Sequence, residues 1–132
     1  MTKPFFSIII PTYNHAKFLE KALKSVYAQN FKNFEVIVID NYSKDNTSKV
    51  VNFYKNIVYK KIKNRGMIAK SRNVGINLSS GKWLAFLDAD DYWSKDKLQV
   101  IYNLIKIKKF DLICHSEWII QSKNKNKKIW SC

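Results

Sequence analysis

Apolar residues recur along this chain with two alternating periods. Residues 5–10 form a short run rich in Ile and Phe, and residues 34–40 form a continuous apolar run, as in a parallel strand buried on both faces. Between them, apolar residues at positions 18, 19, 22, 23, 26 and 27 recur at helical spacing. The pattern predicts a strand, a helix with Asn14 as its N-cap, and a second strand.

The same alternation continues to the end of the chain. Turn residues at 41–47 lead to a helix that carries Val50, Val51 and Tyr54. The later expected elements are, in order, a strand at 56–62, a helix at 66–81 closed by Gly81, a strand at 82–88, a helix at 94–107 and a strand at 110–116. Alternating strands and helices predict an α/β protein with a parallel sheet and right-handed crossovers.

Length and composition fit one globular domain. The 132 residues are 46% hydrophobic with three Gly and two Pro, which excludes a disordered or low-complexity chain. Two cysteines, Cys114 and Cys132, provide neither a disulfide framework nor a zinc site, so a reducing cytoplasm is expected. We find no apolar stretch long enough to span a bilayer and no signal-peptide pattern.

The charge is strongly basic. Twenty-four Lys and Arg against ten Asp and Glu give a net charge of +14, which attracts anions. Most lysines are spread along the chain, and one local cluster comprises Lys123, Lys125, Lys127 and Lys128. That cluster fits a solvated tail or, alternatively, docking on acidic lipid.

Polar residues follow the predicted strands. In parallel sheets ligands bind outside the carboxyl ends of the strands, so the residues at those ends are the candidates for a site. They are Thr12, Tyr13 and Asn14 after the first strand, Asp40 and Asn41 after the second, and Asp88, Asp90 and Asp91 after the fourth.

The aspartates within "WLAFLDADDYW" are a candidate metal site. Three of ten acidic residues occupy four positions, and in an extended segment Asp88 and Asp90 share a face, about 7 Å apart, with Ala89 turned into the fold. Their oxygens suit Mg²⁺ or Mn²⁺, ions that also bind substrate phosphates. The alternative is capping of the next helix, although Ser94 and Asp96 already suit that task.

Two long segments resemble a known family. "FSIIIPTYNHAKFLEKALKSVYAQNFKNFEVIVIDNYSKDNT" and "NRGMIAKSRNVGINLSSGKWLAFLDADD" resemble the nucleotide-binding half of the inverting glycosyltransferases of family 2. The resemblance extends from about Ser7 to about Trp93. It implies the GT-A fold, a Rossmann-like, mainly parallel sheet flanked by helices on both faces.

The resemblance implies roles in nucleotide binding. Pro11, Thr12 and Tyr13 would line the base, and Asp40 would accept a hydrogen bond from the ring N–H of uracil. An acceptor-only carboxylate can select a base with an N–H in this way. The alternative interpretation of Asp40 is a turn-forming residue before Asn41.

The resemblance also implies contacts with the rest of the donor. Arg72 would bind the diphosphate, for which a planar guanidinium is suited; otherwise it is an exposed surface residue. Asp88 would contact the ribose or the sugar, with Ala89 beside it. Asp90 would hold the metal with Asp88, and Asp91 would assist either.

The sequence departs from the family at two points. Asn41, Tyr42 and Ser43 replace the usual Asp-Gly-Ser, so Asn41 is expected to carry any positive φ in this turn. Family members also continue with an acceptor-binding part that carries a general base. We interpret residues 1–132 as a single nucleotide-sugar-binding subdomain without that part.

The remaining candidate residues are given no catalytic role. We interpret Glu117 as a surface residue, and His15 and His115 as structural or solvated.

Three functions are consistent with the sequence. The first is inverting transfer of a sugar from a nucleotide-diphosphate donor, UDP-linked by expectation, to a glycan or lipid-linked acceptor in polysaccharide biosynthesis. The second is nucleotide-sugar binding without turnover, and the third, disfavoured, is nucleic-acid binding driven by charge. We expect a cytoplasmic protein, with peripheral contact at the inner face of the membrane through residues such as Trp118 and Trp130.

Overall fold

A four-stranded parallel sheet forms the centre of the first part of the chain. The computed structural model describes residues 3–113, 117–119 and 128–130. The strands are β1 (Phe6–Thr12), β2 (Phe34–Asp40), β3 (Ile57–Lys61) and β4 (Trp83–Phe86), in the order β3-β2-β1-β4. Every neighbouring pair in this sheet is parallel, as the sequence predicts.

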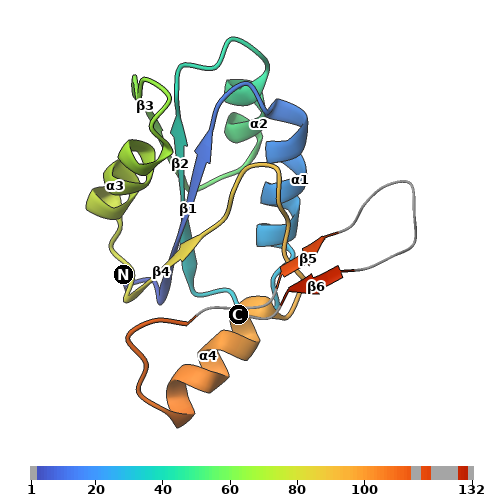
Figure 1. The fold of residues 1–132 in the computed structure, drawn as a ribbon, viewed down its shortest axis with the longest axis vertical. Helices are drawn as coiled ribbons and strands as arrows, with labels where there is room; N and C mark the ends of the chain where they lie inside the picture. The colour runs from blue at the N-terminus through green and yellow to red at the C-terminus, as the bar shows by residue number, and fades with distance from the viewer. Residues whose placement is uncertain (1–2, 114–116, 120–127, 131–132) are drawn as a thin grey trace. The chain divides into compact units, whose positions relative to one another are not determined.

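Helices connect the strands. They are α1 (Ala16–Tyr27), α2 (Thr47–Phe53), α3 (Ile68–Leu78) and α4 (Lys97–Ile107). Figure 1 shows α3 on one side of the sheet and α1 and α2 on the other, which explains why the middle residues of the two central strands are apolar on both faces. The α/β class with helices on both faces is confirmed.

The chain divides into two compact units, Met1–Val100 and Ile101–Cys132. In the second unit, β5 (Glu117–Ile119) and β6 (Lys128–Trp130) form an antiparallel pair. None of the described helices is long and apolar enough to cross a bilayer. The interpretation of residues 1–132 as a single domain stays a prediction.

The core lies around β1 and β2. Ile8, Ile9 and Ile10 are fully buried, and so are Ile37 and Ile39 of the neighbouring strand. From one face α3 contributes Val74 to this core, and from the other α1 buries its apolar stripe, which consists of Leu19, Ala22, Leu23 and Val26. The apolar runs in the sequence of the two central strands therefore coincide with the buried residues.

Two predicted elements differ from the observed ones. Residues 110–113 are not a strand, and Leu112 is 78% exposed, whereas a strand of a parallel sheet needs cover on both faces. The remaining part of that predicted strand, 114–116, lies outside the described residues. The helix predicted over 66–81 ends at Leu78, and Gly81 instead lies in the turn before β4, where its backbone N–H donates to Ser7 Oγ.

The predicted helix caps are also wrong. Asn14 is not the N-cap of α1: its φ is 51°, and His15 precedes the helix without a side-chain cap. The cap comes from a distant segment, because Asp45 Oδ2 accepts a hydrogen bond from Ala16 N at 2.9 Å. Likewise α4 begins only at Lys97, and Ser94 instead offers its backbone carbonyl to Gln29 Nε2.

Glu35 links the amino end of β2 to the turn before β4. Its Oε1 accepts hydrogen bonds from Ser7 Oγ, from Ser80 N and Oγ, and from Gly81 N. Partial burial raises the pKa of Glu35, but these hydrogen bonds outweigh it and hold the pKa below its ordinary value. The ionised carboxylate therefore stabilises this end of the sheet.

We expect Glu35→Gln to lower the free energy of unfolding by about 1–3 kcal/mol at pH 7, because the amide replaces a charged acceptor. A lowered pKa means that this stabilisation is present above the ordinary value of 4.5 and is lost as the pH falls through the lowered pKa. Urea denaturation between pH 3 and 7 should show the two proteins converging at low pH. Glu20→Gln, which removes only the exposed pair with Lys24, should change little.

We expect Gly75→Ala to destabilise the protein although alanine favours helices. An added Cβ would overlap Ile9 Cγ2 in the core, and overpacking costs typically about 1–3 kcal/mol, more than the gain of about 1 kcal/mol in propensity. Asn77→Ala, at an exposed position of the same helix, is the matched control and should be neutral or slightly stabilising. Urea denaturation of the two variants tests the close approach of α3 to β1.

Candidate functional site

The carboxyl ends of β1, β2 and β3 lie side by side. Thr12 pairs with Asp40 in the register of β1 and β2, and Asp40 pairs with Lys61 in that of β2 and β3. The backbone N–H of Asn41 donates to the carbonyl of Thr12 at 3.0 Å, which continues the ladder one residue past the strand. Two of the predicted site residues, Thr12 and Asp40, are therefore neighbours at this edge.

Asp40 is fully buried and both of its carboxylate oxygens accept hydrogen bonds. Oδ1 accepts from Ser43 N at 2.9 Å and from Ser43 Oγ at 2.5 Å, and Oδ2 accepts from Tyr59 OH at 2.6 Å. This is the turn-forming role that the sequence left open as the alternative. A base could bind to Asp40 only after one of these partners moved, so the base contact stays a prediction.

Tyr59 is the partner of Asp40 on the neighbouring strand. Burial raises the pKa of the Tyr59 hydroxyl, and the hydrogen bond to Asp40 and the negative charge of that carboxylate raise it further, to well above the ordinary range. Tyr59 is therefore neutral and donates to a charged acceptor, the stronger kind of hydrogen bond.

Side-chain hydrogen bonds extend from Asp40 to two more loops. Ser43 Oγ accepts from Asn14 N at 2.8 Å, and Asn14 Oδ1 accepts from Lys44 N at 2.8 Å. On the other side, Asn41 Oδ1 accepts from Asn64 N at 2.9 Å. The loops that follow β1, β2 and β3 are thus joined by polar side chains.

Tyr42, rather than Asn41, carries the positive φ in the turn after β2, with a value of 54°. The expectation for Asn41 is wrong because its backbone still pairs with β1, so the chain reverses one residue later. An aromatic residue therefore occupies the left-handed region that glycine fills at little cost.

The residues expected to line the base differ in exposure. Pro11 is half-buried, Tyr13 is 52% exposed, and Thr12 is buried. The hydroxyl of Thr12 has no hydrogen-bond partner within the described part of the chain. A buried polar group without a partner at this edge is one that a ligand could satisfy.

Arg72 and Asp88 form an ion pair. Arg72 NH2 lies 2.7 Å from Asp88 Oδ1, which joins α3 to the turn after β4, and the guanidinium lies 5.9 Å from the centre of the Phe86 ring. The buried Nε of Arg72 lacks a partner among the described residues. A guanidinium has five N–H donors, so this pairing leaves Arg72 with capacity for a further anion.

The aspartates form a turn rather than an extended segment. β4 ends at Phe86, and Asp91 N donates to the carbonyl of Asp88 at 3.0 Å. The alternation that placed Asp88 and Asp90 on one face of a strand therefore does not apply. Ala89, however, is buried as expected, while Asp88 and Asp90 are exposed.

These carboxylates fit a metal ion that takes the rest of its ligands from water and from a substrate. No group of three or more His, Cys, Asp or Glu close enough to hold a metal occurs in the described ranges. Asp88 already pairs with Arg72, so Asp90 is the more available oxygen ligand. The donor set suits a hard cation that keeps waters and takes phosphate oxygens from a substrate.

Other candidate residues remain outside this arrangement. His15 lies exposed before α1, with its ring against Phe18. His115 lies outside the described residues, and Glu117 begins β5. The sequence interpretation missed the hydrogen bonds of Tyr59, Ser43 and Asn64. Tyr59 lies two residues before Lys61, the residue that pairs with Asp40, and the sequence alone does not give this register.

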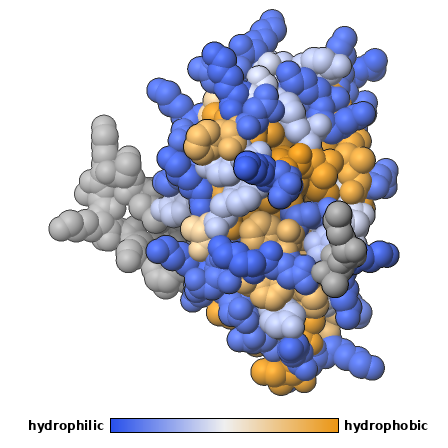
Figure 2. All heavy atoms as spheres, turned by 180° about the vertical axis from the view of Figure 1, so that it is seen from behind, coloured by the Kyte–Doolittle hydropathy of each residue, from blue (hydrophilic) through white to orange (hydrophobic). Residues whose placement is uncertain are grey.

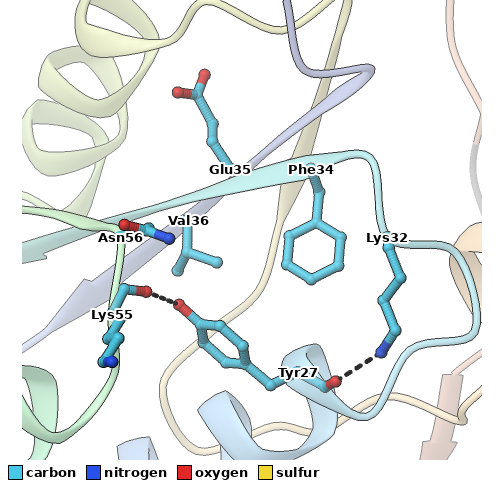
Figure 3. Close-up of a pocket in the computed structure, with 7 residues that line it drawn as sticks. All are labelled: Tyr27, Lys32, Phe34, Glu35, Val36, Lys55 and Asn56. Atoms are coloured by element: carbon cyan, nitrogen blue, oxygen red, sulfur yellow. Dashed lines mark hydrogen bonds between the residues drawn. The ribbon is translucent and has the colours of Figure 1, made fainter. Parts of the chain in front are cut away.

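One pocket lies at the opposite end of the sheet. It has a volume of about 260 Å³ and is lined by Tyr27, Lys32, Phe34, Glu35, Val36, Lys55 and Asn56 (Figure 3). Tyr27 OH donates to the carbonyl of Lys55, and Lys32 Nζ donates to that of Tyr27. Phe34 is the first residue of β2 and Asp40 the last, so this pocket is separate from the predicted donor site.

The fold matches that of GT-A type glycosyltransferases. The chain belongs to the family described as "Glycosyl transferase family 2", which it matches over residues 7–130. It is 39% identical over 109 residues to the amylovoran biosynthesis glycosyltransferase AmsB of Erwinia amylovora, and the match covers 76% of this chain and 36% of AmsB.

Solved structures show the same fold. The Staphylococcus aureus TarS structure with UDP-GlcNAc has a TM-score of 0.75 and 35% identity, over 80% of this chain and 32% of that one. The mannosyltransferase PcManGT of Pyrobaculum calidifontis, solved with GDP-Man and Mn²⁺, has a TM-score of 0.71 and 25% identity, over 80% and 33%. The chain thus spans about a third of the length of these relatives.

We expect Asp40→Asn to lower the free energy of unfolding by about 2–4 kcal/mol, because it removes the charged acceptor of three hydrogen bonds. Tyr59→Phe should cost about 1–2 kcal/mol, and the double variant should lose less than the sum. Tyr92→Phe, at an exposed position, is the control. An Asp40→Asn protein with the stability of the wild type would show that Asp40 does not hold the fold.

The raised pKa of Tyr59 adds a test at high pH. The hydrogen bond from neutral Tyr59 to Asp40 stabilises the fold fully below pH 10, the ordinary pKa of tyrosine. This stabilisation is lost as the pH rises toward the folded-state pKa of Tyr59. The stability difference between wild type and Tyr59→Phe should therefore shrink above pH 10 in urea denaturation.

Proposed function

We propose that this chain binds a nucleotide-diphosphate sugar, UDP-linked, as the donor-binding part of an inverting glycosyltransferase. The observation that carries the proposal is the ion pair of Arg72 with Asp88, which holds a guanidinium at the turn that also carries the exposed Asp90. A cation-binding carboxylate next to an arginine suits a diphosphate leaving group. Membership of the family supports the same chemistry.

The proposed roles follow the arrangement of the site. Asp90, with Asp88, would hold Mg²⁺ or Mn²⁺, and such an ion would offset the negative charge of the departing diphosphate. Arg72 binds a phosphate oxygen through the donors that Asp88 leaves free. Pro11, Thr12 and Tyr13 contact the base, and Ala89 keeps the aspartate turn against the fold. Asp40 would accept a hydrogen bond from the ring N–H of the base once Ser43 or Tyr59 moves away from its carboxylate.

The relatives support the donor and the metal. TarS has been solved with UDP and with UDP-GlcNAc, and PcManGT with GDP-Man and Mn²⁺. These ligands belong to those proteins, and their extension to this chain is our proposal. The sugar is transferred to a glycan or a lipid-linked acceptor in polysaccharide biosynthesis, in the cytoplasm and in peripheral contact with the inner face of the membrane.

A second candidate is nucleotide-sugar binding without turnover. It is favoured by one feature of the assignment: every described residue of the proposed site has a role toward the donor or the metal, which leaves none of them to deprotonate an acceptor hydroxyl. Donor hydrolysis and transfer assays with Mn²⁺ and a set of acceptors separate the two functions. Binding without either reaction would favour this second candidate.

We expect UDP with Mn²⁺ to raise the melting temperature by several degrees, because a ligand at 100 times its Kd stabilises by about 2.7 kcal/mol. Asp90→Asn should abolish the part of the shift that requires Mn²⁺, and Arg72→Gln should weaken the response with and without metal. Asp96→Asn, which removes an exposed carboxylate outside the turn, is the matched control. An unchanged melting temperature with UDP, GDP and their sugar conjugates would refute the donor proposal.

A further inference from the structure

A cluster of positive charge surrounds the carboxyl end of β3. We call it the basic rim, and its exposed members are Lys44, Lys61, Lys63, Arg65 and Lys70. The buried Asn64 fixes the loop between them, since its N–H donates to Asn41 Oδ1, its Nδ2 to Ser71 Oγ, and its Oδ1 accepts from Gly66 N. The charges on either side of Asn64 are therefore held on an ordered loop.

Nothing in the described structure neutralises the basic rim. None of its five cations forms an ion pair with a described residue. The neighbouring acids are engaged otherwise: Asp40 is buried, and Asp45 accepts hydrogen bonds from Ala16 N and from Thr47 N and Oγ1. Five adjacent uncompensated charges create a field that attracts an anionic surface.

Two apolar side chains lie within the basic rim. Met67 is 55% exposed and Ile68 is 54% exposed, between Arg65 and Lys70 at the start of α3. Figure 2 shows that hydrophobic areas lie among hydrophilic residues on one face of the molecule. In the basic rim, two large exposed apolar residues are consecutive in the sequence. A soluble polyanion gains little from such side chains, whereas a bilayer buries them.

We propose that the basic rim and its apolar tip, Met67 and Ile68, dock this chain on the surface of an anionic bilayer. The cations contact acidic headgroups, and the tip enters the boundary between headgroups and acyl chains. This surface lies at the sheet edge that carries Thr12 and Asp40. The inference builds on the membrane contact proposed above, but not on sugar transfer.

Sedimentation with vesicles tests the docking surface. We expect the chain to bind phosphatidylcholine vesicles that contain phosphatidylglycerol, and to bind pure phosphatidylcholine far more weakly. Lys63→Gln with Arg65→Gln should reduce binding roughly 25-fold, about fivefold for each charge. Met67→Ser with Ile68→Ser should reduce it at least about tenfold, because the apolar burial is lost.

Matched controls exclude a general effect of charge or hydropathy. Lys32→Gln with Lys55→Gln removes the same charge at the opposite end of the sheet, and Phe53→Ser removes an apolar side chain that is 82% exposed on α2. Both should bind within about twofold of wild type, because these side chains are not part of the basic rim or its apolar tip. Surface charges also act mainly within a Debye length. Thermal melts establish that every variant is folded.

Three results would overturn the proposal. They are absence of binding to the acidic vesicles, equal losses in the control variants, and unchanged binding of the Met67→Ser, Ile68→Ser protein. The last result, with loss in the Lys63→Gln, Arg65→Gln protein, would indicate a surface for a soluble polyanion. A failed UDP response together with normal vesicle binding would refute only the donor proposal.

Discussion

The edge of the sheet that carries the candidate site depends on one buried carboxylate. Asp40 is fully buried at the end of β2, and its three hydrogen-bond donors come from the next turn and from the neighbouring strand. A buried carboxylate is costly unless its oxygens are satisfied, so Ser43 and Tyr59 are held in place. Ser43 in turn fixes Asn14, and through it the loop after β1. The positions of candidate binding residues on these loops therefore depend on the hydrogen bonds of Asp40.

The opposite end of β2 is built in a similar way. Glu35, the second residue of that strand, accepts hydrogen bonds from Ser7 on β1 and from the turn before β4. The chain has only ten acidic residues, and two of them, Glu35 and Asp40, lie near the two ends of this one central strand. The apolar middle of β2 supplies burial, and the carboxylates at its ends define how the neighbouring loops meet it. Burial gives the sheet its stability, while these polar contacts give it specific connections.

Much of this fold could be predicted from periodicity, because strands covered on both faces and helices covered on one leave different patterns. The patterns of β1, β2 and α1 are unambiguous for this reason. The caps could not be predicted, since the cap of α1 comes from Asp45, 29 residues away along the chain. For the site, the strand ends placed Thr12 and Asp40 at one edge, as the register shows. The ion pair of Arg72 with Asp88 brings together two residues for which the resemblance implies donor contacts, and those contacts stay predictions. The buried state of Asp40 depends on Tyr59, a partner that only the pairing of β2 with β3 brings close.

The charges at the aspartate turn explain why the proposed function includes a metal ion. Arg72 compensates Asp88, but the same turn carries the exposed Asp90, beside the position proposed for a diphosphate. Like charges a few ångströms apart repel one another, and the basic surface of the protein reduces this repulsion only partly because solvent screens it. A divalent cation held by Asp90 would offset this repulsion, since hard cations bind both carboxylate and phosphate oxygens. On this argument, the diphosphate would bind more weakly at this turn with Arg72 alone than with Arg72 and a metal ion, and metal and donor would bind cooperatively.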